Sequence, residues 1–523
     1  MVAETDAGSV RSDVDRGSPL LWVTNPANGL TVGSVPNMSA EQVDALARKL
    51  RAAQPEWEEI GPDQRSRHLL RWLDWIMDND QHILGLVQQE AGKSWGDASI
   101  ESVVCVEVIN YYAKHGARFL ADETRRPHGP ASLTKKLELF RRPFQLVGII
   151  TPWNYPLAMP MMDVPGALVA GAAVLTKPSD VTPLAWSEVV RGWNEAIGAP
   201  PILGCATGLA GTGSAVVDAV DMVQFTGSTA TGRRIAVRAA ERLMPASLEL
   251  GGKDPMIVLS DANLERAVGG AVWGGLFNSG QSCVAVERIY VEAPIYDEFV
   301  SRLTEKVASI RQGMDPQGSF ATDIGAMATE AQIELVERQI ADAVAKGARV
   351  VTGGKRLDTG LFFPPTILVD VDHAMDCMRH ETFGPTLPIM KVQSEDEAVR
   401  LANDSPYGLG SSVWTSDPTR ARRVGRRLDA GAVNINNAMT NVFQFPLPMG
   451  GWKESGLGQR FGGANGVHKF CRQKAYVSER VRVPSELHWY PYTLRKARIT
   501  GMSVRLLGLH DWRRRLGRKG GPA

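Results

Sequence analysis

The sequence predicts an α/β fold organised around parallel sheets. Short apolar runs, typical of buried strands, alternate with stretches of helical periodicity over most of the 523 residues. Strands that alternate with helices favour a parallel sheet covered on both faces. The hydrophobic content of 44% and the charged content of 22% are ordinary for a globular protein, and the length allows two to four domains.

The first half of the chain is expected to begin with a flexible tail over residues 1–22. Two amphipathic helices follow, and after them strands and helices alternate. The expected helices are 40–53, 64–90, 165–172, 183–197 and 231–240, and the expected strands are 144–151, 173–177 and 222–225. The apolar stretch 146–176 contains Asp163 and four prolines, so it is interpreted as strand, loop, helix and strand rather than a membrane span.

A second α/β region begins near residue 248. Its expected strands are 255–259, 288–292 and 348–352, and its expected helices are 264–278, 295–310 and 330–346. The sequence therefore predicts two α/β domains with a seam near residue 250. No internal repeat and no low-complexity linker stands out.

Composition excludes several classes of protein. Lys and Arg number 58 against 57 Asp and Glu, so a general nucleic-acid binder is not expected. Five widely spaced cysteines without a CxxC pair exclude a disulfide framework and a zinc ribbon, and no metal site is expected. The N-terminal residues carry acids and no apolar run, so no secretory signal is predicted. These features favour a cytoplasmic protein.

Cys283 and Glu249 are the first candidates for chemistry. Cys283 follows small and polar residues in GQSCVAVER, where a thiolate would be a strong nucleophile. Taken alone, a single cysteine is more often a buried structural residue. Glu249 lies between two leucines in SLELGGKDP, where burial is costly unless the carboxylate has a partner or acts as a base.

Three further motifs follow predicted strands or open predicted helices. Asn154 in TPWNYP has an amide that suits a developing oxyanion, although an Asx-type turn before Pro156 is the default interpretation of this motif taken alone. Lys177 and Asp180 in LTKPSD stand at the carboxyl end of a strand, where dinucleotides bind in open sheets. Gly227 and Ser228 in FTGSTATG open a helix, a position that suits either a phosphate or an ordinary cap.

Together these motifs resemble the aldehyde dehydrogenase superfamily over about residues 23–480. Further segments that carry the resemblance are VTNPANGLTVGSVP, HETFGPTLPI, NDSPYGLGSSVW, GAVNIN and PMGGWKESGLG. The resemblance implies that Cys283 is the nucleophile, that Glu249 is the general base and that Asn154 stabilises the oxyanion. It implies contacts to NAD, or to NADP, from Ile150, Trp153, Lys177, Asp180, Gly227, Ser228, Glu381 and Phe383.

The resemblance also implies a domain plan. A Rossmann-like NAD(P)-binding domain would take residues 23–127 and 147–250, and an α/β catalytic domain residues 251–472. A small β arm of residues 128–146 and 473–483 would join subunits into a homodimer or homotetramer. A basic extension, residues 484–523, would follow.

The implied reaction is oxidation of an aldehyde to a carboxylic acid through a thiohemiacetal and a thioester on Cys283. A relative that transfers the acyl group to coenzyme A would lack Glu249. A non-catalytic structural member would lack one of the three catalytic residues. A thiol hydrolase without redox chemistry would want a histidine near the cysteine.

The substrate is less specified than the reaction. Met159, Met161 and Met162 lie where the family places its tunnel, with Asp163 after them and no arginine among them. Methionine is apolar and adaptable, so an apolar aldehyde is favoured, although plain core packing explains these residues equally well. A semialdehyde such as succinate semialdehyde is the alternative.

The chain departs from the commonest family pattern in three places. His380 precedes Glu381, Asp180 is shorter than the usual glutamate, and the segment after GLG reads QRFGG where the family often has an acid.

The C-terminal extension differs in charge from the rest of the chain. Residues 480–523 contain eleven Lys or Arg and two Asp or Glu, with an aromatic cluster, HWYPY, near their start. Leu494, Ile499, Met502, Leu506 and Leu509 recur at mixed helical spacing. A peripheral membrane contact is one interpretation, and packing against another subunit is the other.

Overall fold

The computed structural model describes residues 18–128 and 132–515. The chain divides into two compact units, which we call the main unit and the arm unit. The main unit is Met1–Leu120 with Pro143–Arg472, and the arm unit is Ala121–Arg142 with Gln473–Ala523.

The first sheet of the main unit has six strands in the order β19-β9-β8-β5-β6-β7. Every neighbouring pair is parallel except β19 with β9. Its middle strands are buried along their whole length, as continuous apolar runs in parallel sheets are. The strands are β5 (Leu146–Ile150), β6 (Ala173–Lys177), β7 (Leu203–Cys205), β8 (Met222–Thr226), β9 (Ala246–Glu249) and β19 (Gly456–Leu457).

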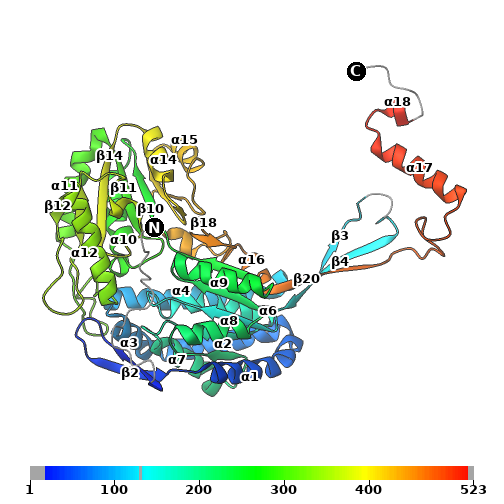
Figure 1. Cartoon of the computed structure of the whole chain (residues 1–523), viewed down its shortest axis with the longest axis horizontal. Coiled ribbons are helices and arrows are strands. Elements are labelled where there is room, and N and C mark those ends of the chain that lie inside the picture. Colours follow the sequence, from blue (N-terminus) through cyan, green and yellow to red (C-terminus); the bar gives the residue numbers. More distant parts are fainter. Residues whose placement is uncertain (1–17, 129–131, 516–523) are drawn as a thin grey trace. The chain divides into compact units, whose positions relative to one another are not determined.

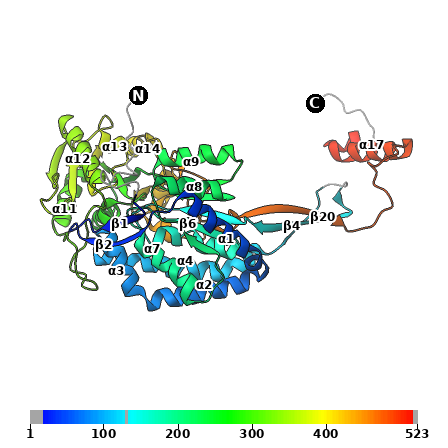
Figure 2. The same ribbon diagram turned by 60° about the horizontal axis from the view of Figure 1, so that its bottom comes forward.

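Helices α1 to α9 gather around this sheet (Figure 1). They are α1 (Ala40–Glu59), α2 (Gly61–Asp78), α3 (Asp80–Ala91), α4 (Trp95–Leu120), α5 (Ala158–Met161), α6 (Val164–Ala170), α7 (Leu184–Arg191), α8 (Ala210–Ala219) and α9 (Thr229–Glu241). An antiparallel hairpin, β1 (Leu20–Thr24) with β2 (Thr31–Pro36), lies beside α3 (Figure 2).

The second sheet has seven strands in the order β12-β13-β14-β11-β10-β16-β17, with only β12 antiparallel to its neighbour. The strands are β10 (Asp254–Val258), β11 (Val286–Glu292), β12 (Arg349–Thr352), β13 (Thr366–Val369), β14 (Thr386–Val392), β16 (Ser412–Trp414) and β17 (Asn434–Ile435). Helices α10 (Leu264–Leu276), α11 (Tyr296–Ala308), α12 (Glu330–Ala345), α13 (Asp376–Arg379), α14 (Glu395–Asn403) and α15 (Pro418–Gly425) accompany it (Figure 1).

The chain passes from one sheet to the other near the predicted seam at residue 250. Strand β9 ends at Glu249 in the first sheet, and β10 begins at Asp254 in the second. The short strand β19 returns from the region 251–472 to the edge of the first sheet. A small two-stranded sheet of β15 (Tyr407–Gly408) and β18 (Trp452–Lys453) precedes this return, and α16 (Asn465–His468) follows it. The division into a cofactor-binding and a catalytic domain remains a prediction.

Most predicted elements are present, and strand 173–177 has the predicted bounds. The single helix expected over 64–90 is two helices, because the chain turns at Asn79 between α2 and α3. The helix expected over 183–197 leaves α-helical geometry after Arg191 and ends in one π-helical turn. The helix expected over 264–278 ends at Leu276, because Asn278 and Ser279 adopt positive φ angles of 55° and 56°.

Several elements were not predicted, and β1 and α4 are two of them. Strand β1 begins at Leu20, so the prediction of a flexible tail is wrong for residues 20–22; residues 1–17 lie outside the described residues. The helix α4 spans 26 residues with Asp97 and Glu101 on its buried side. Buried acids interrupt the apolar periodicity by which a helix is recognised, which explains why the pattern missed it.

The stretch 146–176 folds as strand, loop, helices and strand, as predicted. Within the described part of the chain, no helix has the length and apolar character needed to cross a membrane. All five cysteines are free thiols.

The arm unit contains a three-stranded sheet in the order β20-β4-β3. Its strands are β3 (Glu123–Arg125), β4 (Lys135–Pro143) and β20 (Cys471–Glu479), so both predicted arm segments are strands. Helices α17 (Leu494–Gly508) and α18 (Trp512–Arg515) follow, and no residue of either helix is buried. Thr493 caps α17 by accepting a hydrogen bond from the backbone N–H of Lys496 at 3.2 Å.

Candidate active site

One cavity of about 1440 Å³ in the main unit brings together ten of the eleven predicted site residues. Two of them, Asn154 and Cys283, are predicted catalytic residues. The other eight are the predicted cofactor contacts: Ile150, Trp153, Lys177, Asp180, Gly227, Ser228, Glu381 and Phe383. Glu249 is the exception, since it does not belong to the wall of this cavity.

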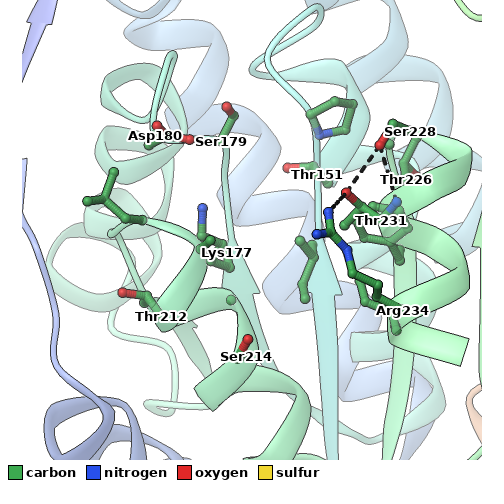
Figure 3. A pocket seen from close by; sticks show the side chains of 18 of the residues that line it. Thr151, Lys177, Ser179, Asp180, Thr212, Ser214, Thr226, Ser228, Thr231 and Arg234 are labelled. Atoms are coloured by element: carbon green, nitrogen blue, oxygen red, sulfur yellow. Dashed lines mark hydrogen bonds between the residues drawn. The ribbon is translucent and has the colours of Figure 1, made fainter. Parts of the chain in front are cut away.

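The cavity opens at the carboxyl ends of β5, β6 and β8, because Ile150 and Lys177 end two of these strands and Gly227 follows the third. Figure 3 shows Lys177 and Asp180 on one wall and Ser228 on the other. Ligands of open α/β sheets bind in this position, outside the carboxyl ends of parallel strands.

Ser228 caps α9, a helix of 13 residues whose N-terminus faces the cavity. Its hydroxyl accepts a hydrogen bond from the backbone N–H of Thr231 at 3.3 Å (Figure 3). A Cβ on Gly227 would lie 2.5 Å from the Phe225 ring, so a side chain here would displace the wall. Free N–H groups and the helix dipole favour an anion such as a phosphate at this end.

Lys177 is 6% exposed and its ammonium donates to the carbonyl of Pro178 at 3.0 Å. Burial lowers the pKa of Lys177, while the charge of Asp180 opposes that shift. A cation and a carboxylate therefore stand together on the wall opposite α9, where they suit the hydroxyl groups of a ribose.

Glu381 and Phe383 are held by a buried carboxylate that the sequence analysis did not single out. Glu287 accepts hydrogen bonds from the backbone N–H groups of Thr382 at 2.7 Å and Phe383 at 2.8 Å, and from the ammonium of Lys253 at 2.6 Å. Glu381 itself accepts from the backbone N–H of Gly252 at 3.0 Å. Burial, with the charge of Glu287, raises the pKa of Glu381.

The ring of Phe383 packs against the ring of Trp153. The two ring centroids are 5.4 Å apart at an interplanar angle of 88°, an edge-to-face contact. This contact joins the loop after β5 to the loop after α13, which are far apart in the sequence.

Cys283 lies just after the turn Phe277–Gly280, and Asn154 binds the same segment. The Asn154 amide donates to the carbonyl of Gln281 at 3.0 Å, and the Asn278 amide donates to the carbonyl of Asn154 at 2.9 Å. The amide oxygen of Asn154 has no hydrogen-bond partner among residues 18–128 and 132–515. The Asn154 amide is therefore fixed next to the nucleophile candidate, with one of its two N–H bonds engaged.

Burial raises the pKa of the Cys283 thiol to about 12, and the nearby carboxylates Glu381, Asp254 and Glu249 add to this, whereas Arg460 opposes it. The cysteine is therefore a thiol at neutral pH. Because the thiolate is the nucleophile, a proton must leave before attack.

Glu101 on α4 is another functional residue that the sequence analysis missed. Its carboxylate accepts from the backbone N–H groups of Leu157 and Ala158, both at 2.9 Å, and from the Lys93 ammonium at 2.6 Å. These bonds fix the segment that follows Asn154. The only signal in the sequence was an acid at the start of the largely apolar helical segment ESVVCVEV.

Glu249 ends β9 and is 3% exposed, and neither of its carboxylate oxygens has a side-chain hydrogen-bond partner in the described part of the chain. Burial raises its pKa to about 7, while the charge of Arg460 opposes the shift. A carboxyl group with this pKa is half ionised near neutral pH, which suits a general base.

Gly252 couples the segment of Glu249 to that of Cys283. A Cβ on Gly252 would lie 2.2 Å from the carbonyl oxygen of Cys283, so only glycine allows this approach.

The residues present fit a nicotinamide dinucleotide. The cavity offers a helix N-terminus for the phosphates, polar groups for two riboses, and apolar or aromatic side chains at Ile150, Trp153 and Phe383. The reacting sulfur lies on the wall of the same cavity.

Comparisons with known proteins agree with this arrangement. Residues 14–476 match the model of the Aldehyde dehydrogenase family. The chain is 36% identical over 474 residues to 4,4'-diapolycopene aldehyde oxidase of Methylomonas sp. That alignment covers 90% of this chain and 88% of the relative. A protein of Mycobacterium ulcerans, whose name proposes a succinate-semialdehyde dehydrogenase that uses NADP, is 37% identical over 477 residues and 90% of each chain. The crystal structure of lactaldehyde dehydrogenase from Escherichia coli has a TM-score of 0.84 at 32% identity and covers 88% of this chain and 96% of that one.

The protonated state of Cys283 has a measurable consequence. Alkylation of Cys283 by iodoacetamide should accelerate about tenfold per pH unit between about pH 7 and about pH 9, because only the thiolate reacts. Mass spectrometry of the modified peptides measures each site, and the Cys283→Ala variant identifies the signal of the other thiols. A rate that is constant over this range would contradict the raised pKa.

Proposed function

The chain belongs to the aldehyde dehydrogenase family, and on this premise we propose which of its residues carry out the oxidation. The enzyme oxidises an aldehyde to a carboxylic acid with NAD or NADP. The observation that carries the residue assignment is that Cys283 and Asn154 line the same cavity as the eight predicted cofactor contacts.

Cys283 is the proposed nucleophile and Asn154 the proposed oxyanion donor. The sulfur attacks the aldehyde carbon and forms a thiohemiacetal, whose oxygen becomes an oxyanion. The free N–H of the Asn154 amide and the backbone N–H of Cys283 stabilise that oxygen. The hydrogen bond from Asn154 to Gln281 supports this role because it holds the amide in place before substrate arrives.

Glu249 is the proposed base that activates water for hydrolysis of the thioester. Its pKa of about 7 supports this role, since the group accepts a proton readily at neutral pH. Glu249 lies behind the cavity wall in this conformation, so its side chain must turn toward Cys283, or a water must bridge the two.

The bound nicotinamide cofactor supplies the two-electron oxidation that turns the thiohemiacetal into the thioester. Ser228 and the N-terminus of α9 would hold its pyrophosphate, Lys177 and Asp180 its adenosine ribose, and Glu381 its nicotinamide ribose. Asp180 favours NAD, because a carboxylate repels a 2′-phosphate, whereas Lys177 could pair with one.

The proposed substrate is an apolar aldehyde. Met159 lines the cavity and can contact a substrate there. Met161 and Met162 are buried in the core and do not belong to the cavity wall. Arg460 is within 3.9 Å of Met159 and 3.7 Å of Met162, but it also pairs with Asp163 and is therefore not a free partner for a semialdehyde carboxylate.

The arm sheet β20-β4-β3 is proposed to join copies of the chain into a homodimer or homotetramer. Its strand β20 is exposed along most of its length, and an exposed strand offers side chains and an edge to a partner.

The C-terminal extension is proposed to contact an anionic membrane surface. Trp489, Tyr490 and Tyr492 are 53%, 80% and 70% exposed, and the apolar residues of α17 are exposed beside its arginines. Aromatic residues favour the membrane interface, and basic residues favour anionic lipid. Such a contact would hold a cytoplasmic enzyme near an apolar, membrane-derived aldehyde.

Substitution of the two reacting groups tests the mechanism. Cys283→Ala should abolish reduction of NAD(P), and Glu249→Gln should form about one reduced nicotinamide per site and then stop, because the thioester is not hydrolysed. Stopped-flow absorbance at the reduced-nicotinamide wavelength measures both. Steady-state turnover at the unmodified rate in either variant would contradict the assignment.

Asp180→Ser tests the choice of cofactor. The unmodified enzyme should have a higher kcat/KM with NAD than with NADP, and Asp180→Ser should move this ratio toward NADP by about tenfold, since it removes one repulsive charge. Steady-state kinetics with each cofactor give the ratio. A preference for NADP in the unmodified enzyme would show that Lys177 dominates.

A panel of aldehydes tests the substrate class. The specificity constant should be higher for decanal and benzaldehyde than for succinic semialdehyde, because no unpaired cation is available for a distal carboxylate. The opposite order would favour the semialdehyde alternative.

Truncation tests the membrane contact. The full-length chain should sediment with liposomes that contain anionic lipid, and a chain stopped after Val483 should not. Liposomes of neutral lipid are the control. Equal sedimentation of both chains, or of neither, would leave the packing interpretation for the extension.

A further inference from the structure

Behind the wall of the cavity lies a buried charged cluster that the proposed mechanism does not use. It consists of Arg460, Asp163 and Lys469, whose side chains are 0%, 0% and 12% exposed. The Nε of Arg460 is 3.2 Å from a carboxylate oxygen of Asp163, and the Nζ of Lys469 is 2.8 Å from the other oxygen. The two cations thus share the carboxylate of Asp163.

The cluster adjoins Glu249 through the backbone of the first sheet. Strand β19 pairs with β9, with Gly456 opposite Glu249, so the segment that leads to Arg460 runs along β9. Strand β8 pairs with β9 on its other side, with Thr226 opposite Glu249. Directly opposed residues of neighbouring strands point to the same face of a sheet. The guanidinium of Arg460 donates to the hydroxyl of Thr226, which places it on the face that carries the Glu249 side chain.

The charges of the cluster balance only when Glu249 is counted. Arg460 and Lys469 carry two positive charges against one carboxylate, Asp163. Their remaining partners are neutral: Thr226 and two methionine sulfurs for Arg460, and Gln224, at 2.8 Å, for Lys469. An uncompensated buried charge is costly, and the ionised Glu249 removes the imbalance.

We propose that Arg460 is a positioning residue for the catalytic base Glu249. The positive charge of Arg460 favours the ionised carboxylate of Glu249 in the buried space behind Cys283. The inference rests on the proposed role of Glu249. Arg460 takes no part in bond making; its charge offsets the cost of burying an acid whose oxygens have no side-chain hydrogen-bond partner among the described residues.

The charged groups that face Glu249 come from three segments of the main unit. Arg460 and Lys469 stabilise its ionised form, and Asp163, just before α6, opposes them. The charges of Glu249 and Arg460 both act on the Cys283 thiol, which is neutral at physiological pH. Tyr112, on α4, faces Asp163 and Arg460 and stays neutral because burial raises its pKa. Removal of Arg460 and removal of Asp163 therefore have opposite expected effects on Glu249.

The experiment measures the pH profile of thioester hydrolysis by stopped flow, in which the burst reports formation of the thioester and the steady phase reports its hydrolysis. Arg460→Met, which matches the surrounding methionines in polarity, should shift the profile upward by about one pH unit. From a pKa of about 7, that shift lowers the steady rate about fivefold near pH 7 and leaves it nearly unchanged near pH 9.

Two matched variants separate charge from packing. Arg460→Lys should restore the profile because it keeps the charge, and Asp163→Asn should shift the profile downward because it removes a carboxylate. If the cluster had a purely structural role, Arg460→Met and Asp163→Asn would shift the pH profile in the same direction. If Arg460→Met fails to fold, the comparison of Arg460→Lys with Asp163→Asn still gives the sign.

Coinciding profiles for Arg460→Met and the unmodified enzyme would overturn the inference. So would a raised KM for succinic semialdehyde without a shifted profile, because Arg460 would then bind substrate. Full turnover by Glu249→Gln is a different outcome: it would overturn the proposed role of Glu249, on which the inference depends.

Discussion

The placement of an ionisable acid in the protein interior is the constraint on which the site depends. Glu249 ends β9, the strand next to the edge strand β19, is almost fully buried, and within the described residues neither of its carboxylate oxygens has a side-chain hydrogen-bond partner. A carboxyl group in this position is neutral unless positive charge is close. The return of the chain through β19 supplies that charge, since it carries Arg460 along β9 and to the hydroxyl of Thr226. The two-residue strand β19 thus places the positive charge that favours ionisation of Glu249.

The fold could be predicted where local patterns are simple. The strand 173–177 and the helix 330–346 are recognisable because one is a continuous apolar run and the other is regularly amphipathic. The pattern failed at α4, where Glu101 is buried because it fixes the segment after Asn154 rather than because it packs. It also failed at Asn79, where a turn of one residue separates two helices of similar periodicity.

The residues of the candidate site that lie in motifs could be predicted from the sequence, whereas the buried charged residues packed behind them could not. Lys177, Ser228 and Cys283 stand at ends of strands and helices, so their meeting in one cavity follows from the topology of parallel sheets. Arg460 was visible only as a departure from the family pattern, because an arginine in a glycine-rich segment usually points to solvent. Its burial depends on Asp163, which is almost 300 positions earlier in the chain.

The neutral state of the resting thiol has a consequence beyond catalysis. Peroxides oxidise cysteine through its thiolate, and the sulfenic acid that forms would end the enzyme's activity unless it were reduced. Because burial raises the pKa of Cys283 to about 12, almost none of the resting enzyme presents a thiolate. The fold therefore protects its most reactive atom during the interval between substrates, and exposure to oxidants is limited to the moment at which a proton has left the sulfur.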